Sequence, residues 1–159
     1  MPVSENHASG EEIHSDARFE ALKLDLLLRQ RAQAVIDNET HVKDWRELAE
    51  KAHRANLKRT QIRGLENVVN TAQSLATIVN YIFNQIPRLK EWRPGSWGET
   101  LAKRYEGLPV LADRLLDEDQ NPNTLERALQ RQNLVLLLAR GLTAHFVAYN
   151  LFLGSLRHE

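Results

Sequence analysis

The chain has 159 residues, a hydrophobic content of 42%, no cysteine, and 21 acidic residues balanced by 21 basic ones. The length and the hydrophobic content predict one globular domain with a real core. Zero net charge argues against a uniformly basic nucleic-acid-binding surface, and the lack of cysteine excludes disulfides, thiolate metal sites and cysteine nucleophiles.

The N-terminal stretch, residues 1–12, is polar and acidic, and we expect a disordered tail there, followed by a single helical domain over residues 13–159. The tail lacks the basic and apolar regions of a secretory signal. A broad apolar stripe predicts a helix over residues 15–36, and Asp37-Asn38 ends it. A second helix with one apolar side is expected over residues 39–56.

The strongest helix signal lies in residues 61–86. Apolar residues recur there at steps of three and four, which predicts one helix with a single apolar face. These residues are Ile62, Leu65, Val69, Ala72, Leu75, Val79, Ile82 and Ile86. Thr60 precedes the run, where its hydroxyl can cap the first turn, and Pro87 disfavours helical conformation in the residue before it.

Residues 87–98 contain two prolines, two glycines and two tryptophans, which predicts a loop. Short helices are expected over about 99–106 and 109–117, followed by an acidic connection. The last helix is predicted to begin at Asn123, as the N-cap of a capping-box arrangement, and to run to Leu153. Because no segment alternates apolar and polar residues, the predicted fold class is all-α, a helical bundle of four to five main helices.

The apolar segment Leu134–Leu153 is long enough to be mistaken for a membrane span. It contains Arg140, and a central arginine costs roughly 2.5–3.5 kcal/mol in a bilayer. We therefore expect this segment to be a buried helix of a cytoplasmic protein with no membrane partner, and the lack of cysteine fits a reducing compartment.

The start of the 61–86 helix carries the densest positive charge of the chain. Between Lys51 and Leu65 there is no acidic residue, and the basic ones are Lys51, Arg54, Lys58, Arg59 and Arg63. Basic side chains beside the unpaired N–H groups of a helix start predict binding to phosphate, with Gln61 as a further polar partner. The alternative is a solvated surface whose charges pair with acidic residues elsewhere.

The loop that follows this helix is a second candidate. Between Pro87 and Trp97, basic side chains alternate with Trp92 and Trp97, a pattern that suits stacking on the bases of single-stranded nucleic acid. Because tryptophan is mostly buried, we favour the alternative, in which both side chains pin the loop onto the bundle.

Arg140 and His145 form a third candidate, because their spacing resembles the minimal Arg–His signature of the HEPN ribonucleases. That resemblance implies RNA cleavage without metal, by residues from two subunits. Five positions apart, the two side chains lie about 140° apart around a helix. The alternative is a buried histidine with a local partner and an arginine at the surface. The sequence has no metal-ligand spacing, phosphate loop or nucleophile elbow, so no cofactor is expected.

Two stretches together resemble a different family. The helix opening Lys58-Arg59-Thr60-Gln61-Ile62-Arg63 is similar to the Thr-Ser-Gln-Ile-Arg type of opening in the small helical subunit of type III (Csm-type) CRISPR effector complexes. The stretch from Ala144 to Gly154, with Val147-Ala148-Tyr149 and Phe152, is similar to the closing pattern of that family. The two matches cover about a quarter of the chain, in the expected order.

This resemblance implies a non-enzymatic protein that is present in several copies, stacked as a filament along a guide RNA paired with its target RNA, and in contact with other effector subunits. It points to Lys58, Arg59, Gln61 and Arg63 as RNA-binding residues. From charge and helical placement we add Arg88, Arg131 and Arg140. A helical protein-interaction module remains a further alternative, because the last helix is apolar nearly all round.

Overall fold

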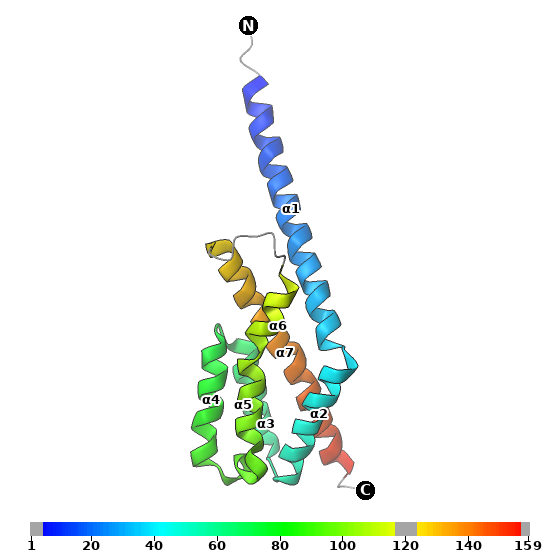
Figure 1. Ribbon diagram of the computed structural model, residues 1–159, viewed down its shortest axis with the longest axis vertical. Coiled ribbons are helices and arrows are strands. Elements are labelled where there is room, and N and C mark those ends of the chain that lie inside the picture. Colours follow the sequence, from blue (N-terminus) through cyan, green and yellow to red (C-terminus); the bar gives the residue numbers. More distant parts are fainter. Residues whose placement is uncertain (1–4, 117–123, 157–159) are drawn as a thin grey trace.

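The computed structural model describes residues 5–116 and 124–156, with side chains from Asp16 onward, and every regular element within them is helical. The predicted all-α class is confirmed (Figure 1). In chain order the elements are α1 (Glu5–Ile36), α2 (Glu39–Arg54), α3 (Arg59–Thr71), α4 (Leu75–Arg88), the 3-10 turns η1 (Lys90–Trp92) and η2 (Pro94–Ser96), α5 (Trp97–Glu106), α6 (Leu108–Leu115) and α7 (Leu125–Leu156).

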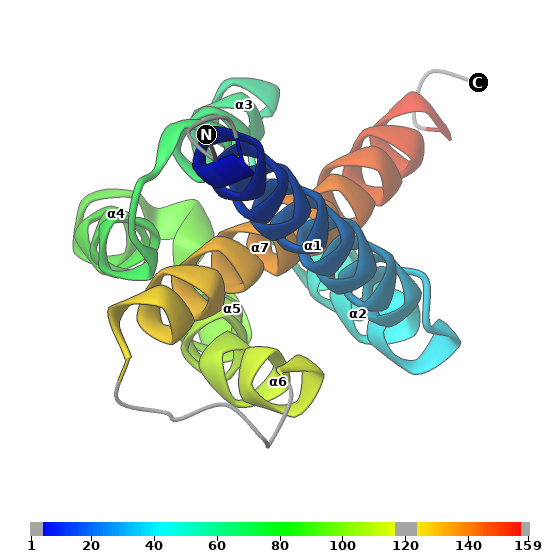
Figure 2. The ribbon, with the colours of Figure 1, turned by 90° about the horizontal axis from the view of Figure 1, so that it is seen from above.

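Helix α7 is the central packing element of the bundle. It contacts α1, α2, α3 and α6, and it crosses under α1 when the molecule is seen from above (Figure 2). At this crossing Gly141 faces Ile36, and a Cβ atom at residue 141 would lie less than 3.0 Å from three side-chain atoms of Ile36. The missing side chain therefore lets the end of α1 approach α7 closely.

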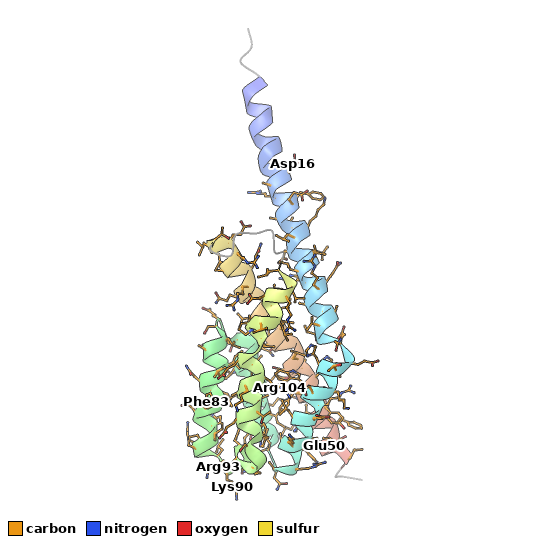
Figure 3. The ribbon with its side chains drawn as sticks, viewed as in Figure 1. Asp16, Glu50, Phe83, Lys90, Arg93 and Arg104 are labelled. Carbon is orange, nitrogen blue, oxygen red and sulfur yellow. The ribbon has the colours of Figure 1, made fainter. Side chains whose placement is uncertain are left out.

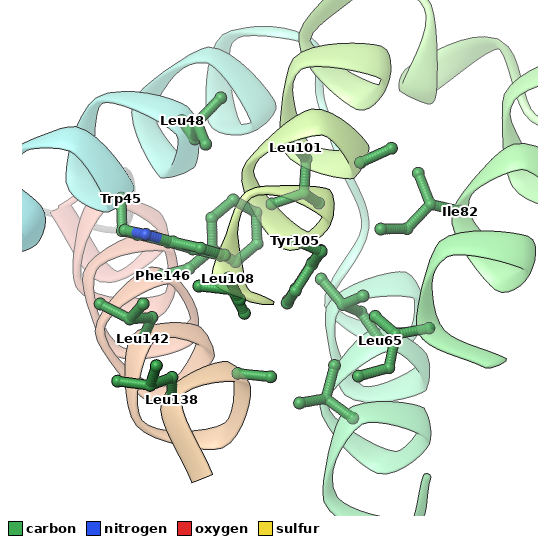
Figure 4. Packing of buried hydrophobic residues seen from close by; sticks show 14 of the residues in the cluster. Trp45, Leu48, Leu65, Ile82, Leu101, Tyr105, Leu108, Leu138, Leu142 and Phe146 are labelled. Carbon is green, nitrogen blue, oxygen red and sulfur yellow. The ribbon is translucent and has the colours of Figure 1, made fainter. Parts of the chain in front are cut away.

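The core fills the space between α7 and the helices around it (Figure 4). Trp45 of α2 meets Tyr105 of α5 edge to face, with ring centroids 5.1 Å apart. Leu65 of α3 and Ile82 of α4 close the opposite side, and both are fully buried. The apolar stripes of the individual helices thus converge on one contiguous core, as helical periodicity requires.

The prediction of a single helix over residues 61–86 is wrong. Helix α3 ends at Thr71, and α4 begins after Ser74, whose side chain accepts a hydrogen bond from the backbone N–H of Thr77. The chain reverses between them, so α4 packs beside α3 (Figure 1). The serine cap satisfies a free donor of the new helix, which makes the break locally stable.

Several helix ends also differ from the predictions. Thr60 is not a cap, because α3 begins one residue earlier at Arg59. Helix α4 continues through Pro87 to Arg88, since a proline near a helix end costs only one N–H donor. Asn123 lies outside the described residues, and Thr124 accepts the capping hydrogen bond from the N–H of Arg127, at 3.2 Å.

The two long helices also extend beyond their predicted ranges. Helix α7 continues past the predicted end at Leu153 to Leu156. Helix α1 begins at Glu5, inside the stretch 1–12 predicted as a disordered tail, and residues 1–4 lie outside the described part. The tail and the single domain over 13–159 therefore stay predictions.

Within the described residues, α7 is the one helix whose length and composition would let it cross a membrane. The most apolar window of α7 is 56% buried inside the bundle, and the core helix of a soluble protein passes the same test. The absence of a membrane partner and the cytoplasmic location stay predictions.

A buried hydrogen bond joins α5 to α7 inside the core. The Thr143 hydroxyl donates to the carbonyl of Ala139, so the Tyr105 hydroxyl donates to Thr143 Oγ1, at 2.5 Å. Burial raises the pKa of Tyr105.

We expect Tyr105→Phe to lower the free energy of unfolding by about 1 kcal/mol, because Thr143 keeps its own donor bond and only one neutral hydrogen bond is lost. Urea denaturation of both proteins measures this difference, and a loss above about 3 kcal/mol would contradict it.

Candidate nucleic-acid interface

Two basic segments that are distant in the sequence meet at one end of the bundle. One is the turn from α2 into α3, and the other is the end of α4 with the loop that follows it. Because α3 and α4 run in opposite directions side by side, both segments lie at the lower end of Figure 1, where Figure 3 labels Lys90 and Arg93. The exposed basic side chains here, which we call the basic end, are Lys51, Arg54, Lys58, Arg59, Arg88, Lys90 and Arg93.

Gln61 joins the two segments. Its Oε1 accepts a hydrogen bond from the backbone N–H of Lys58, at 2.7 Å, which satisfies a free donor at the start of α3. Its Nε2 donates to Oε2 of Glu91 in η1, at 3.4 Å. Both ends of the amide are thus engaged inside the protein, so Gln61 positions the basic end and is not a free polar ligand.

Glu91 is the buried acidic residue beneath this surface, 9% exposed. The hydrogen bond from its own backbone N–H lowers the pKa of Glu91, and the Gln61 amide and the nearby charges of Lys58 and Lys90 lower it further. The carboxylate is therefore charged at neutral pH and attracts both lysines, although within the described part of the chain it forms no ion pair within 4.0 Å with either.

Most of the charge of the basic end is unpaired. In the part of the chain that the structure describes, no ion pair within 4.0 Å involves Lys51, Lys58, Arg59, Arg88 or Lys90. Arg54 pairs with Glu50 at 2.6 Å, as an exposed pair within one helix. Exposed cations without carboxylate partners are available to an external anion.

Arg93 has a structural role that the sequence did not reveal. Its side chain donates to the carbonyls of Ile86 and Pro87, each at 2.8 Å, and so caps the end of α4. An arginine close behind a helix end commonly satisfies the last carbonyl groups. In the sequence, Arg93 follows Pro87 by 6 residues, and this short separation could have indicated that Arg93 caps the end of α4. The predicted helix end at Ile86 instead placed Arg93 in a loop without regular structure.

The other predicted RNA-binding residues have partners within the protein. Arg63 is one turn further along α3 and pairs with Glu66 at 2.8 Å. Arg131 forms two hydrogen bonds with Asp113, at 2.7 and 3.2 Å, and the bonded carboxylate raises the pKa of Arg131. Arg140 donates to the carbonyl of Ala72, at the far end of α3. The structure therefore brings together Lys58, Arg59, Gln61 and Arg88, and separates them from Arg131 and Arg140.

The two loop tryptophans are core residues. Trp92 and Trp97 are 1% and 0% exposed and stack on each other with ring centroids 4.9 Å apart. Trp97 also donates from Nε1 to the carbonyl of Glu91, at 2.9 Å. The interpretation that they pin the loop onto the bundle is confirmed, and neither ring presents a face for stacking on a nucleotide base.

Arg140 and His145 contact different parts of the chain. Arg140 reaches the end of α3, whereas Nε2 of His145 lies 3.1 Å from the carbonyl of Ile36 and 3.9 Å from a carboxylate oxygen of Asp37. The two side chains thus do not form a joint site within one copy of the protein. Among the described residues, no group of three or more His, Asp or Glu is placed to hold a metal ion.

Comparisons with protein-family models, with curated proteins and with solved structures find no match for this chain. The chemistry of the basic end is that of phosphate recognition: lysines act as point charges and arginines as hydrogen-bonding forks toward backbone oxygens.

Proposed function

We propose that this protein is a non-catalytic RNA-binding structural subunit that contacts the RNA backbone through the basic end. The observation that carries this proposal is the meeting of two separate basic segments, with five exposed cations that form no ion pair with any residue the structure describes. Such a surface neutralises phosphates without regard to sequence, because its partners are the backbone oxygens.

The resemblance of residues 58–63 and 144–154 to the small subunit of type III CRISPR effectors supports a more specific proposal. In it, the RNA is a guide strand paired with its target, and the partners are other effector subunits and further copies of this chain in the cytoplasm. Base pairing then reads the sequence, while the protein contacts the backbone.

Fluorescence anisotropy with a labelled RNA, titrated at several salt concentrations, tests the RNA-binding function. We expect binding whose logarithmic salt dependence has a slope of roughly −3.5 for a single strand, because each neutralised phosphate contributes about 0.7 and about five cations of the basic end form no ion pair with any described residue. Absence of binding at low salt, or an affinity independent of salt, would refute the proposal.

The same RNA also distinguishes the ribonuclease alternative. After incubation with the protein in EDTA, we expect intact RNA on a denaturing gel, because the proposed subunit is non-catalytic; Arg140 and His145 contact different parts of one copy, so a nuclease site would need residues from two copies. Cleavage that is lost in His145→Ala would instead identify a metal-independent nuclease.

A further inference from the structure

Helix α1 carries a second apolar face that the bundle does not use. Leu28, Ala32 and Ile36 face the core and are 5%, 0% and 4% exposed. Before them, every described residue from Asp16 to Leu27 except the half-buried Leu24 is exposed, and this part of α1 extends beyond the other helices in Figure 1.

Four large apolar side chains are exposed on this projecting part, and three of them lie on one side of the helix. Phe19, Leu22 and Leu26 are 57%, 68% and 57% exposed. At about 100° per residue they fall within about 60° of one another, and the centre of this stripe lies about 110° around α1 from the centre of its core face. A helix without tertiary contacts is marginal in water, and an aligned apolar stripe on it indicates a helical partner.

We propose that this stripe is an interface between two copies of the chain, in which their α1 helices pair in antiparallel orientation with Phe19 of each copy opposite Leu22 of the other. The interface is isologous, since the same face is used twice around a two-fold axis. It does not depend on the RNA-binding proposal, because it uses none of the basic-end residues.

The charges beside the stripe favour this register. On one side of the seam it places Arg18 next to Asp25 of the second copy, and on the other side Asp16 next to Lys23 of the second copy. Because of the two-fold symmetry, each of these attractive pairs occurs twice. Complementary flanking charges set the register and orientation of paired helices.

The same charges oppose the competing arrangements. A parallel pair would place Arg18 beside Lys23 of the other copy, with like charges in both copies. An antiparallel pair with Leu22 opposite Leu26 would place Lys23 beside Lys23, and Asp25 beside Asp25. Of these three arrangements, only the proposed register joins opposite charges on both sides of the seam among the described side chains, which is the pattern expected for self-recognition and not for an acidic or basic partner.

The present partners of these charges do not prevent the pairing. Within α1, Lys23 lies 3.5 Å from Glu20 and 4.4 Å from the centre of the Phe19 ring, and Asp25 pairs with Arg29 at 3.0 Å. Exposed pairs of this kind contribute about 0.2–0.5 kcal/mol each, so exchanging them for contacts across the interface costs little.

The geometry also leaves room for the two bundles. In the antiparallel arrangement they lie at opposite ends of the helix pair, because each bundle begins near Leu28 of its own α1. In this register residue 27 of one copy lies opposite residue 14 of the other, so the segment that pairs outside both bundles, residues 14–27, is about 21 Å long at 1.5 Å per residue. One pair of helices of this length falls below a standard interface of about 800 Å² per partner, so we expect a dimer of micromolar affinity.

Sedimentation velocity of the full chain over a range of protein concentrations tests the dimer. We expect Leu22→Glu to raise the dimer dissociation constant at least tenfold, because it places a charge in the centre of the seam. Leu125→Glu is the matched control, since Leu125 on α7 is 76% exposed and lies outside the stripe. A parent protein that stays monomeric throughout, or a dimer that both variants weaken equally, would overturn the proposal.

Crosslinking tests the register, because the chain has no native cysteine. In a mixture of the Asp16→Cys and Lys23→Cys variants, a short bismaleimide should join residue 16 of one copy to residue 23 of the other faster than it joins either variant to itself. Mass spectrometry of the crosslinked peptides identifies the pair. Preferential crosslinking of Lys23→Cys to itself would overturn the proposed register. Circular dichroism of each variant verifies that its helices are retained.

Discussion

Replacing Lys58, Arg59 and Arg88 together by alanine is expected to weaken RNA binding by about ten- to hundredfold. These three exposed cations come from both basic segments and form no short ion pair among the described residues. Their loss should also make the slope of the salt dependence less steep by about 2, since each phosphate contact to a single strand contributes about 0.7. The free energy of unfolding should change by less than about 0.5 kcal/mol per residue, as is usual for surface substitutions.

The matched control removes the same charge from other surfaces. Lys43, Lys103 and Arg114 are exposed and lie on α2, α5 and α6, outside the basic end. Their triple alanine variant should bind RNA as the parent does, to within about threefold. Equal weakening by both triple variants would mean that net charge alone drives binding, and the basic end would then not be the RNA interface.

The reversal between Thr71 and Leu75 explains why the two basic segments could not be placed together from the sequence. In a single helix, Arg59 and Arg88 would be separated by about 44 Å, at 1.5 Å per residue. The reversal folds α4 back along α3 and returns Arg88 to the end where α3 begins. The sequence predicted each basic segment separately, but the meeting of the two segments at the basic end depends on this reversal.

The helical period could not reveal that turn. Leu65 and Val69 of α3 and Ile78 and Ile82 of α4 all face the same core, so the steps of three and four continue across the break. The local signal was Ser74, a good N-cap residue, but one polar residue inside a long apolar pattern does not outweigh the pattern. The outer elements were predicted more closely, because Asn38 and Gly107 interrupt their patterns.

The sequence identified some residues of the basic end without predicting their roles correctly, because those roles depend on tertiary contacts. Gln61 was predicted as a ligand of RNA, whereas its amide links Lys58 to Glu91. No role was predicted for Glu91, because basic residues surround it in the sequence. In the structure its carboxylate is near enough to Lys58 and Lys90 for their charges to lower its pKa. The burial of Trp92 and Trp97 was predicted correctly, because large aromatic side chains beside a bundle usually enter its core.

Gly98→Ala is expected to lower the free energy of unfolding by about 2–3 kcal/mol. A Cβ atom at residue 98 would lie 2.7 Å from the carbonyl oxygen of Trp92 and 3.2 Å from Cγ1 of Ile86. A backbone oxygen cannot rotate away, so η1 must move, and Trp92 is stacked on Trp97 and cannot follow without opening the core. Overpacking of this kind costs about 1–3 kcal/mol, and the rigid neighbour places it at the upper end.

Gly154→Ala is the control for this change, because it adds the same methyl group where no atom lies within 4 Å. Inside α7 it should raise the free energy of unfolding by about 0.5–1 kcal/mol, as alanine is the better helix former. Urea denaturation should therefore move the two midpoints in opposite directions.

Because η1 carries Glu91 and Lys90, Gly98→Ala should also weaken RNA binding, whereas Gly154→Ala should not. A Gly98→Ala protein with the same free energy of unfolding as the parent would show that η1 is not held rigidly against α5. In that case η1 would give the basic end no rigid support.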